Sequence, residues 1–242
     1  MSTLSFTQYS FIGADATKFL QGQVTIHVER LEESFTQYTV ICDLKGRIQF
    51  GLWLKKISSE HFEITVSSDQ ATDFEQHIRK YGAFAKITLS AVGEVFPTLK
   101  QHSTVFSAEK TDIVAWQHEA ITDGQAWITQ ATAHAFQPQE LRLHQRHGIQ
   151  YDKGCYLGQE VIARLWFKAQ PKQWLHLIEG VGTAPEPLTK LATGIQVVNS
   201  LAVDENTYQA LVIARPQSLE EEQTLSVLEL PTHLQGDVAR PK

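Results

Sequence analysis

The first half of the chain alternates short apolar runs with polar turns and one helical repeat. Residues 38–42 and 47–55 are apolar-rich runs on either side of the turn sequence 43–46, which predicts a β-hairpin. Residues 61–67 alternate apolar and polar positions, as a half-buried strand does. Phe74, Ile78 and Tyr81 then recur at helical spacing, which predicts a helix over 70–81 that ends at Gly82.

Shorter elements complete this half of the chain. Asp15 stands where it can cap a helix over 16–21, and residues 160–167 are also compatible with a helix. The apolar runs 84–89 and 112–116 predict two more strands. Helices and strands in this irregular order favour an α+β fold.

The pattern changes from Trp174 onward. Four short apolar runs, at 174–178, 194–198, 208–214 and 224–228, are separated by turn residues, and the acidic stretch 218–222 is predicted as a loop. Strands at this spacing predict a small antiparallel barrel or sandwich. We therefore expect two domains, 1–172 and 173–242, with the second packed on the first because so short a segment would be marginally stable alone.

Charge and composition narrow the function classes. The 21 basic and 27 acidic residues give a net charge of −6, which disfavours broad binding to nucleic acid. The longest apolar stretches, such as 50–54, are far shorter than the roughly 20 residues of a membrane-spanning helix. The N-terminal residues do not resemble a signal peptide. We expect a cytoplasmic monomer with no membrane partner and no direct nucleic-acid partner.

The two cysteines, Cys42 and Cys155, are too few for a resident iron–sulfur cluster, which usually takes four protein ligands. Cys155 lies between Gly154 and Tyr156, just before the predicted helix at 160–167, and Lys153 is two residues away. A nearby cation and a helix N-terminus both favour the reactive thiolate. The alternative is that Cys155 is a small buried hydrophobe, as Cys42 is expected to be within its strand.

The segment 153–160, Lys-Gly-Cys-Tyr-Leu-Gly-Gln-Glu, resembles the signature of the YgfZ family, whose members are folate-binding relatives of the glycine-cleavage T protein. Further segments are similar to the same family in the same order. They are Gly-Ala-Asp at 13–15, Phe-Leu-Gln-Gly-Gln-Val-Thr at 19–25, the hairpin 43–47, Pro-Gln at 138–139 and Val-Ile-Ala-Arg at 161–164. The resemblance covers residues 11 to about 172.

The resemblance implies a fold and a role. The fold would be an interleaved α+β core around a central channel for tetrahydrofolate or a derivative, followed by a C-terminal antiparallel β-barrel. The role would be assembly or repair of iron–sulfur clusters in client enzymes, including one that thiomethylates tRNA. Cys155 would be the functional residue, with Lys153 beside it.

The same resemblance implies folate contacts. Trp116 stands eight residues before Gly124, in register with a family tryptophan, and Phe6 occupies the place of a second tryptophan. A pterin ring stacks well on such aromatic faces. The remaining cofactor-binding candidates are Asp43, Lys45, Tyr156, Gln159, Glu160 and Arg164. Ala169 and Lys172-Gln173 depart from the family pattern after Arg164. We predict no metal site, and we interpret His144 and His147 as a surface pair on a helix.

Three alternatives remain. T proteins carry an Asn-Ala-x-Asn pattern after the third core strand, whereas Ser67-Ser68 stands here, so aminomethyl transfer would need Asp69 or Asp73 as a substitute. A second alternative is a folate-regulated module in which Cys155 senses redox state. The third, direct tRNA modification, is disfavoured by the negative net charge.

Overall fold

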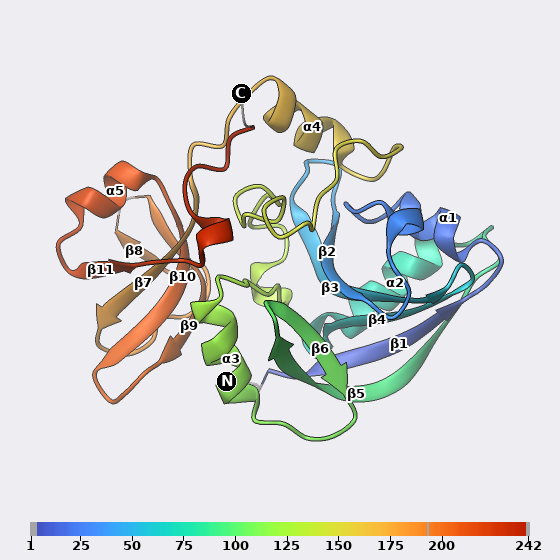
Figure 1. Cartoon of the computed structure of the whole chain (residues 1–242), viewed down its shortest axis with the longest axis horizontal. Coiled ribbons are helices and arrows are strands. Elements are labelled where there is room, and N and C mark those ends of the chain that lie inside the picture. The colour runs from blue at the N-terminus through green and yellow to red at the C-terminus, as the bar shows by residue number, and fades with distance from the viewer. Residues whose placement is uncertain (1–3, 193, 241–242) are drawn as a thin grey trace.

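The computed structural model describes residues 4–192 and 194–240 and consists of two curled antiparallel sheets set side by side (Figure 1). The first has the order β2-β3-β4-β1-β5-β6 and the second the order β11-β7-β10-β9-β8. The first sheet comprises β1 (Phe6–Ile12), β2 (Thr36–Cys42), β3 (Ile48–Ser58), β4 (His61–Ser67), β5 (Thr88–Lys100) and β6 (Ser103–Ser107). The second comprises β7 (Trp174–Val181), β8 (Lys190–Ala192), β9 (Ile195–Ala202), β10 (Thr207–Ala214) and β11 (Leu225–Leu228).

The helices cover the two sheets and join the first sheet to the second. They are α1 (Ala16–Gln21), α2 (Ala71–Tyr81), α3 (Ile113–Thr122), α4 (Gln159–Phe167) and α5 (Pro216–Glu221). Apolar side chains of α1 and α2, such as Phe19 and Phe74, pack on one face of the first sheet. The opposite face shares a second core with α3, the 126–149 segment and strands of the second sheet. One continuous core therefore connects the two sheets.

The predicted elements agree best where the hydrophobic pattern is regular. The helix at 16–21 and the strand at 61–67 have the predicted bounds, and the hairpin, α2 and α4 are present within a few residues of theirs. The predicted strand at 112–116 is wrong. Asp112 caps α3 there, because its carboxylate accepts hydrogen bonds from the backbone N–H groups of Val114 and Ala115.

Three other predictions also need correction. The strand predicted at 84–89 begins only at Thr88, and the acidic stretch 218–222, predicted as a loop, lies largely within α5. The 138–148 segment is a series of turns rather than a helix, since Arg142 and His147 have φ values of 57° and 59°. Strand β1, which lies between β4 and β5 at the centre of the first sheet, was not predicted.

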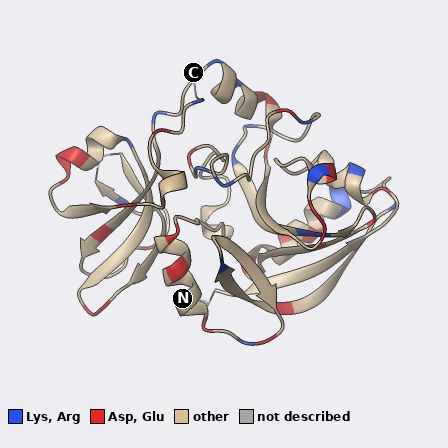
Figure 2. Ribbon diagram, in the orientation of Figure 1, with Lys and Arg blue, Asp and Glu red and all other residues tan. Residues whose placement is uncertain are grey.

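The second sheet is antiparallel and curled, as expected. In the described part of the chain its pairings leave β11 and β8 as edge strands, so it forms a half-barrel rather than a closed one. Residue 172 falls between α4 and β7. Basic and acidic residues are distributed over both sheets (Figure 2). None of the helices in the described ranges is long and apolar enough to cross a membrane.

A close backbone contact fixes the loop before α4 against the hairpin between β2 and β3. Gly158, which precedes α4, has φ of +78°. A Cβ atom at this position would lie 2.5 Å from the carbonyl oxygen of Asp43 and 3.1 Å from the Cβ of Cys42. Only glycine meets both demands, the left-handed conformation and the close approach.

We therefore predict that Gly158→Ala lowers the free energy of unfolding by about 2–3 kcal/mol. Gly154→Ala is the matched control, because a Cβ atom there would have no other atom within 4 Å. Its free energy of unfolding should stay within about 0.5 kcal/mol of wild type. Urea unfolding followed by tryptophan fluorescence measures both values. Equal stability of the two variants would show that the contact at Gly158 does not fix the loop.

Candidate functional site

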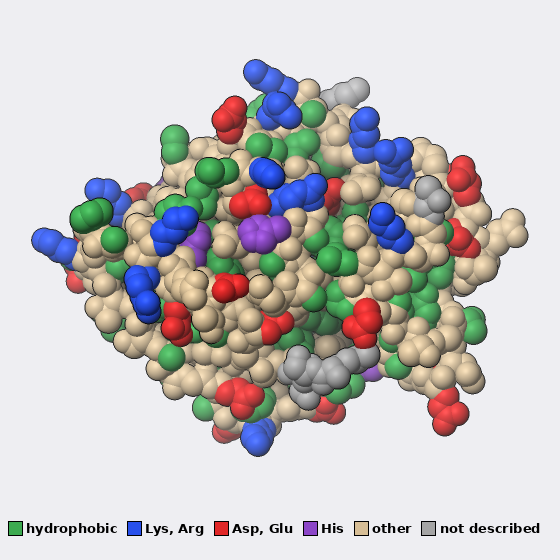
Figure 3. Space-filling view, turned by 180° about the vertical axis from the view of Figure 1, so that it is seen from behind, with side chains coloured by type: hydrophobic (Ala, Val, Ile, Leu, Met, Phe, Trp, Pro, Cys, Tyr) green, Lys and Arg blue, Asp and Glu red, His purple; other side chains and the backbone are tan. Residues whose placement is uncertain are grey.

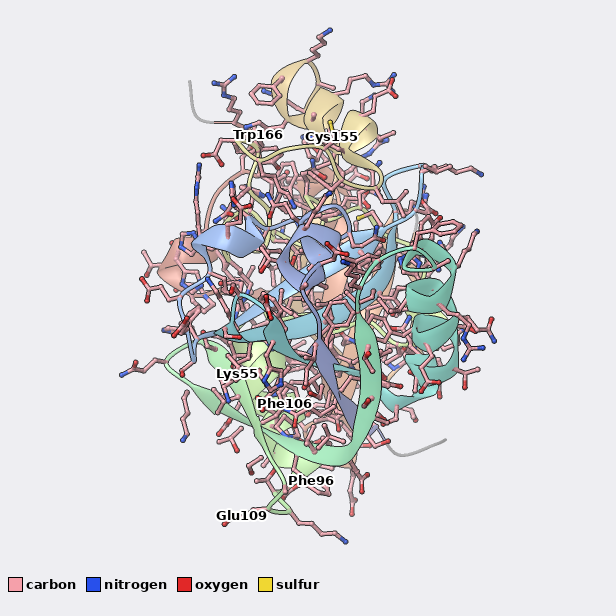
Figure 4. All side chains as sticks on the ribbon, turned by 90° about the vertical axis from the view of Figure 1, so that its right-hand side faces the viewer. Lys55, Phe96, Phe106, Glu109, Cys155 and Trp166 are labelled. Carbon is pink, nitrogen blue, oxygen red and sulfur yellow. The ribbon has the colours of Figure 1, made fainter. Side chains whose placement is uncertain are left out.

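Cys155 is an exposed free thiol at one end of the molecule. It lies in the loop before α4, and Figure 4 shows it beside that helix. The neighbouring Gly154 is also exposed and has open space where a side chain would begin. The expectation that Cys155 precedes a helix is confirmed, and the alternative of a buried residue is wrong. Another molecule can reach this thiol without displacing packed groups.

Cys42, in contrast, is fully buried at the end of β2. Burial raises the pKa of its thiol, and the neighbouring carboxylate of Asp43 raises it further. A thiol in this setting remains protonated and unreactive. The two cysteines are therefore placed for different purposes, packing for Cys42 and access for Cys155.

Lys153 anchors the cysteine loop rather than presenting a free cation. Its Nζ donates hydrogen bonds to the backbone carbonyls of Gln21 at 2.7 Å, Val24 at 2.6 Å and Ile26 at 2.7 Å. The side chain is 7% exposed, and burial lowers its pKa to about 7. Three carbonyl acceptors favour the charged form and oppose this shift. The ammonium is therefore satisfied by backbone that lies more than 120 residues earlier in the chain.

Other contacts join the same two segments. Between them the backbone also pairs, and within the cysteine segment the ammonium of Lys153 lies 4.7 Å from the ring centroid of Tyr156, which is 8% exposed. The backbone N–H of Leu157 donates to the carbonyl of Gly22 at 3.2 Å, and Gln150 donates to the carbonyl of Thr25. The Phe-Leu-Gln-Gly-Gln-Val-Thr segment and the cysteine segment therefore form one unit, although neither segment predicts this from its own pattern.

The hairpin tip lies against this unit, at the close contact between Gly158 and Asp43. The Asp43 carboxylate accepts from the backbone N–H groups of Lys45 and Arg47, and its second oxygen pairs with His134 Nδ1 at 2.9 Å. Burial alone would raise the pKa of Asp43, but these hydrogen bonds hold it below its usual value. Asp43 therefore closes the turn, while Lys45 is exposed and free to meet a ligand.

The other motif residues lie on or beneath α4. Glu160 and Arg164 are exposed one turn apart, and Gln159 is half-buried at the start of the helix. Gln139, from the Pro-Gln element, is fully buried, and its side-chain amide donates to the carbonyl of Ile162 at 2.8 Å. The Pro-Gln element therefore supports the helix that follows the cysteine loop.

Trp116 and Phe6, the predicted pterin contacts, do contact each other. Their ring centroids are 5.3 Å apart, and the side chains are 2% and 0% exposed. Trp116 donates its indole N–H to the hydroxyl of Thr104 at 3.1 Å. Both rings belong to an aromatic cluster that also contains Trp53, Phe106 and Trp127. They lie inside the core rather than on an open surface.

This aromatic cluster and the cysteine lie apart. Figure 4 shows Phe106 in the lower half of the molecule and Cys155 at the upper end. The structure thus brings Cys155, Lys153, Tyr156 and the hairpin tip together, and it does not bring them to Trp116 and Phe6.

A large cavity lies beside the aromatic cluster, between the two sheets. Its volume is about 750 Å³, within the range of small-molecule sites. Trp127 lines it and packs against Trp116 with ring centroids 5.3 Å apart, and Leu4 and Ser5 lead from it into Phe6. The polar groups of its lining include Ser67, Ser68, Asp69, Gln117 and Asn199.

Sequence analysis missed Trp127 and gave Asp69 only a minor part. Asp69 is the second residue after β4 and lines the cavity. Its carboxylate accepts from the Ser67 hydroxyl at 2.6 Å and from the N–H of Gln130 at 3.1 Å. The signal for Asp69 was its position after the third predicted strand. Trp127 has no comparable signal, because it lies in a segment without regular periodicity.

Similarity to known proteins bears on the family and the fold. A scan against protein-family models finds no match. An uncharacterized protein of Haemophilus influenzae is 30% identical over 203 residues, which cover 73% of this chain and 72% of that protein. The tRNA-modifying protein YgfZ of Vibrio atlanticus is 23% identical, over 95% of this chain and 83% of that protein. That of Colwellia psychrerythraea is 28% identical, over 70% and 68%.

Among solved structures, the glycine cleavage system aminomethyltransferase T of Bartonella henselae superposes with a TM-score of 0.62. The match covers 93% of this chain and 83% of that chain at 12% sequence identity, so it shows a shared fold. The sequence relatives, the shared fold and the joined signature segments lead to one conclusion: this chain belongs to the YgfZ family, on the fold of the aminomethyltransferase T proteins.

Proposed function

We propose that this protein binds tetrahydrofolate or a derivative and serves as an accessory protein in the assembly or repair of iron–sulfur enzymes, with Cys155 as its functional thiol. The observation that carries the proposal is the contrast around Cys155. Lys153 and Tyr156 of the same signature are buried and tied down, while the thiol between them is exposed. A rigid loop that presents one open thiol suits transfer to or from a partner protein.

The distribution of charge supports a client enzyme as that partner. On the face that Figure 3 shows, Lys and Arg side chains are more frequent in the upper half of the view, but Asp and Glu side chains lie among them. A protein that holds RNA directly needs a concentrated basic surface. The curated relatives are named tRNA-modifying proteins. For this chain we assign the connection to tRNA to a client enzyme.

The cavity beside the aromatic cluster fits a folate. Trp127 lines the cavity and would be the aromatic side chain that meets the pterin, and Trp116 packs against Trp127. The Asp69 carboxylate suits the amino and ring N–H donors of a pterin, because carboxylates are strong hydrogen-bond acceptors. Bound tetrahydrofolate would supply a carrier for one-carbon units. Trp116 and Phe6, which were predicted as direct contacts, would instead support the residues that line the cavity.

A second candidate, aminomethyl transfer, is favoured by the position of Asp69. In that reaction an aminomethyl-lipoyl carrier gives its carbon to tetrahydrofolate, and ammonia and the dihydrolipoyl carrier are released. Asp69 lines the cavity shortly after β4, where its carboxylate could bind the amine of the aminomethyl group. Formation of methylenetetrahydrofolate from this carrier, lost in Asp69→Asn and retained in Cys155→Ser, would make this the main function.

Folate binding is tested by titrating the protein with tetrahydrofolate and following tryptophan quenching. We expect binding by wild type and a roughly tenfold or greater loss of affinity in Asp69→Asn, because a charged acceptor is removed from the cavity. Asp73→Asn is the matched control, since Asp73 pairs with Gln130 outside the cavity lining. Absence of binding by wild type, or equal affinity in both variants, would contradict this placement.

The role of the thiol is tested in a bacterium that lacks its own YgfZ protein. Cys155→Ser should abolish the rescue of tRNA thiomethylation while leaving folate affinity and thermal stability unchanged, because the side chain is exposed. Cys42→Ala is the control for loss of a sulfur atom by itself. It should rescue normally and lose about 1–2 kcal/mol of stability from its buried site. Full rescue by Cys155→Ser would overturn the proposal.

A further inference from the structure

An open groove with basic and aromatic side chains lies at the C-terminal end of α4. Its volume is about 780 Å³, and it shares no lining residue with the cavity assigned to folate. The last two residues of α4, residues 168–172 of the connection to β7, and Arg240 line it. Trp166 lines this groove, and Figure 4 shows Trp166 and Cys155 at the same end of the molecule.

The groove is locally basic in a chain that is acidic overall. Lys168, Lys172 and Arg240 line it with exposed side chains, and its lining contains no Asp or Glu. Among the described residues, no carboxylate forms an ion pair with any of the three. The acidic residues closest to it in sequence, Glu160 and Asp237, lie outside the lining. Uncompensated cations around a hollow attract an anionic partner, even though the net charge of the chain is −6.

Phe167 gives the groove an exposed apolar surface. Its side chain is 50% exposed, and the guanidinium carbon of Arg240 lies 4.9 Å from the centroid of its ring. The neighbouring Trp166 is stacked on Tyr151, with ring centroids 4.2 Å apart and planes at 6°. An exposed aromatic ring with cations around it is typical of an interaction surface, because one apolar side chain of a partner can pack on the ring.

The segment between α4 and β7 offers backbone groups to a ligand. Residues 169–172 belong to neither a helix nor a strand, and within the described ranges their backbone N–H and C=O groups make no hydrogen bond to another residue. Such groups can pair with the main chain of a bound peptide. The groove therefore combines main-chain pairing groups, cations and one exposed ring, which together suit a short acidic peptide segment.

We propose that this groove is the docking surface for an acidic segment of a client enzyme, which brings that enzyme to Cys155. The identity of the partner rests on the proposed function. Carboxylates of the segment pair with Lys168, Lys172 and Arg240, and an apolar side chain between them packs on Phe167. Since α4 leads from the cysteine loop to the groove and its nine residues are about 14 Å long, four or five extended residues of the partner cover its length.

The test uses the capped peptide Asp-Glu-Phe-Glu-Asp as the probe and follows ¹H–¹⁵N NMR signals of the full-length protein. Amide signals of residues 166–172 should shift in a saturable manner, and the titration gives the dissociation constant. Two control peptides separate charge from apolar contact. Asn-Gln-Phe-Gln-Asn lacks the charges and Asp-Glu-Ser-Glu-Asp lacks the ring, and each should bind about tenfold more weakly or less.

A matched pair of double variants locates the binding site. Lys168→Gln/Lys172→Gln should lose about fivefold or more in affinity for the acidic peptide, because two of the three cations are removed. Lys110→Gln/Lys190→Gln removes the same charge from exposed positions outside the groove and should bind like wild type. All four side chains are exposed, so both variants should keep the thermal stability of wild type.

The same two variants connect the groove to the thiol in a bacterium that lacks its own YgfZ protein. Lys168→Gln/Lys172→Gln should lower the rescue of tRNA thiomethylation, while the rate at which iodoacetamide alkylates Cys155 in the purified protein stays unchanged. Lys110→Gln/Lys190→Gln should rescue normally. If Cys155→Ser abolishes rescue and Lys168→Gln/Lys172→Gln rescues fully, the docking surface is wrong although the proposed function stands.

The binding experiment can also overturn the docking surface directly. It does so if residues 166–172 show no saturable shift, if the uncharged peptide binds as well as the acidic one, or if the two double variants bind alike. Tighter binding at residues 166–172 by a strand of twelve deoxythymidines would instead identify a nucleic-acid site. Tighter binding there by the triglutamate form of tetrahydrofolate would identify a folate site. Either result would replace the proposed partner.

Discussion

The buried ammonium of Lys153 is the constraint on which the site depends. A charged group removed from water must find strong partners, and here those partners are three backbone carbonyls of the 21–26 segment. That segment begins at the last residue of α1 and precedes β2, whereas Lys153 lies in the loop before α4. One side chain therefore fixes the distance between two parts of the chain that are remote in sequence. Its role is in positioning, and the adjacent Cys155 is left exposed because Lys153 and Tyr156 on either side of it face inward.

The two proposed tasks, partner contact at Cys155 and folate binding in the cavity, lie at different ends of the molecule. At one end the cysteine loop, the hairpin tip and α4 form a rigid, accessible edge held by Lys153, Gly158 and Gln139. At the other end an aromatic cluster supports the larger cavity between the two sheets. The two sheets share one core, so a ligand in the cavity and a partner at the cysteine loop would act on one continuous body. No residue needs to touch both.

Sequence reasoning succeeded where a local pattern determines the structure. Hydrophobic periodicity located α2, β4 and the hairpin, and the signature segments identified the family and the exposed cysteine. The helix α1 was predicted from Asp15 as its cap, and it forms although the Asp15 side chain makes no capping hydrogen bond. Sequence reasoning failed where tertiary contacts decide. The apolar run at 112–116 is helical because Asp112 caps it. The ammonium of Lys153, near the thiol, is not free because it donates hydrogen bonds to backbone carbonyls more than 120 residues away in the chain. Trp127 could not be found, since its importance comes only from the cavity that it lines.

The measurement that tests the central claim most directly is amide hydrogen exchange on Lys153→Met, which keeps a similar side-chain volume and removes the ammonium. The account predicts that residues 19–28 and 153–162 both exchange at least about tenfold faster, because their shared tether is lost, while α2 keeps its protection. Unchanged protection in both segments would contradict the account, because it would show that the three carbonyl contacts do not hold the cysteine loop in place.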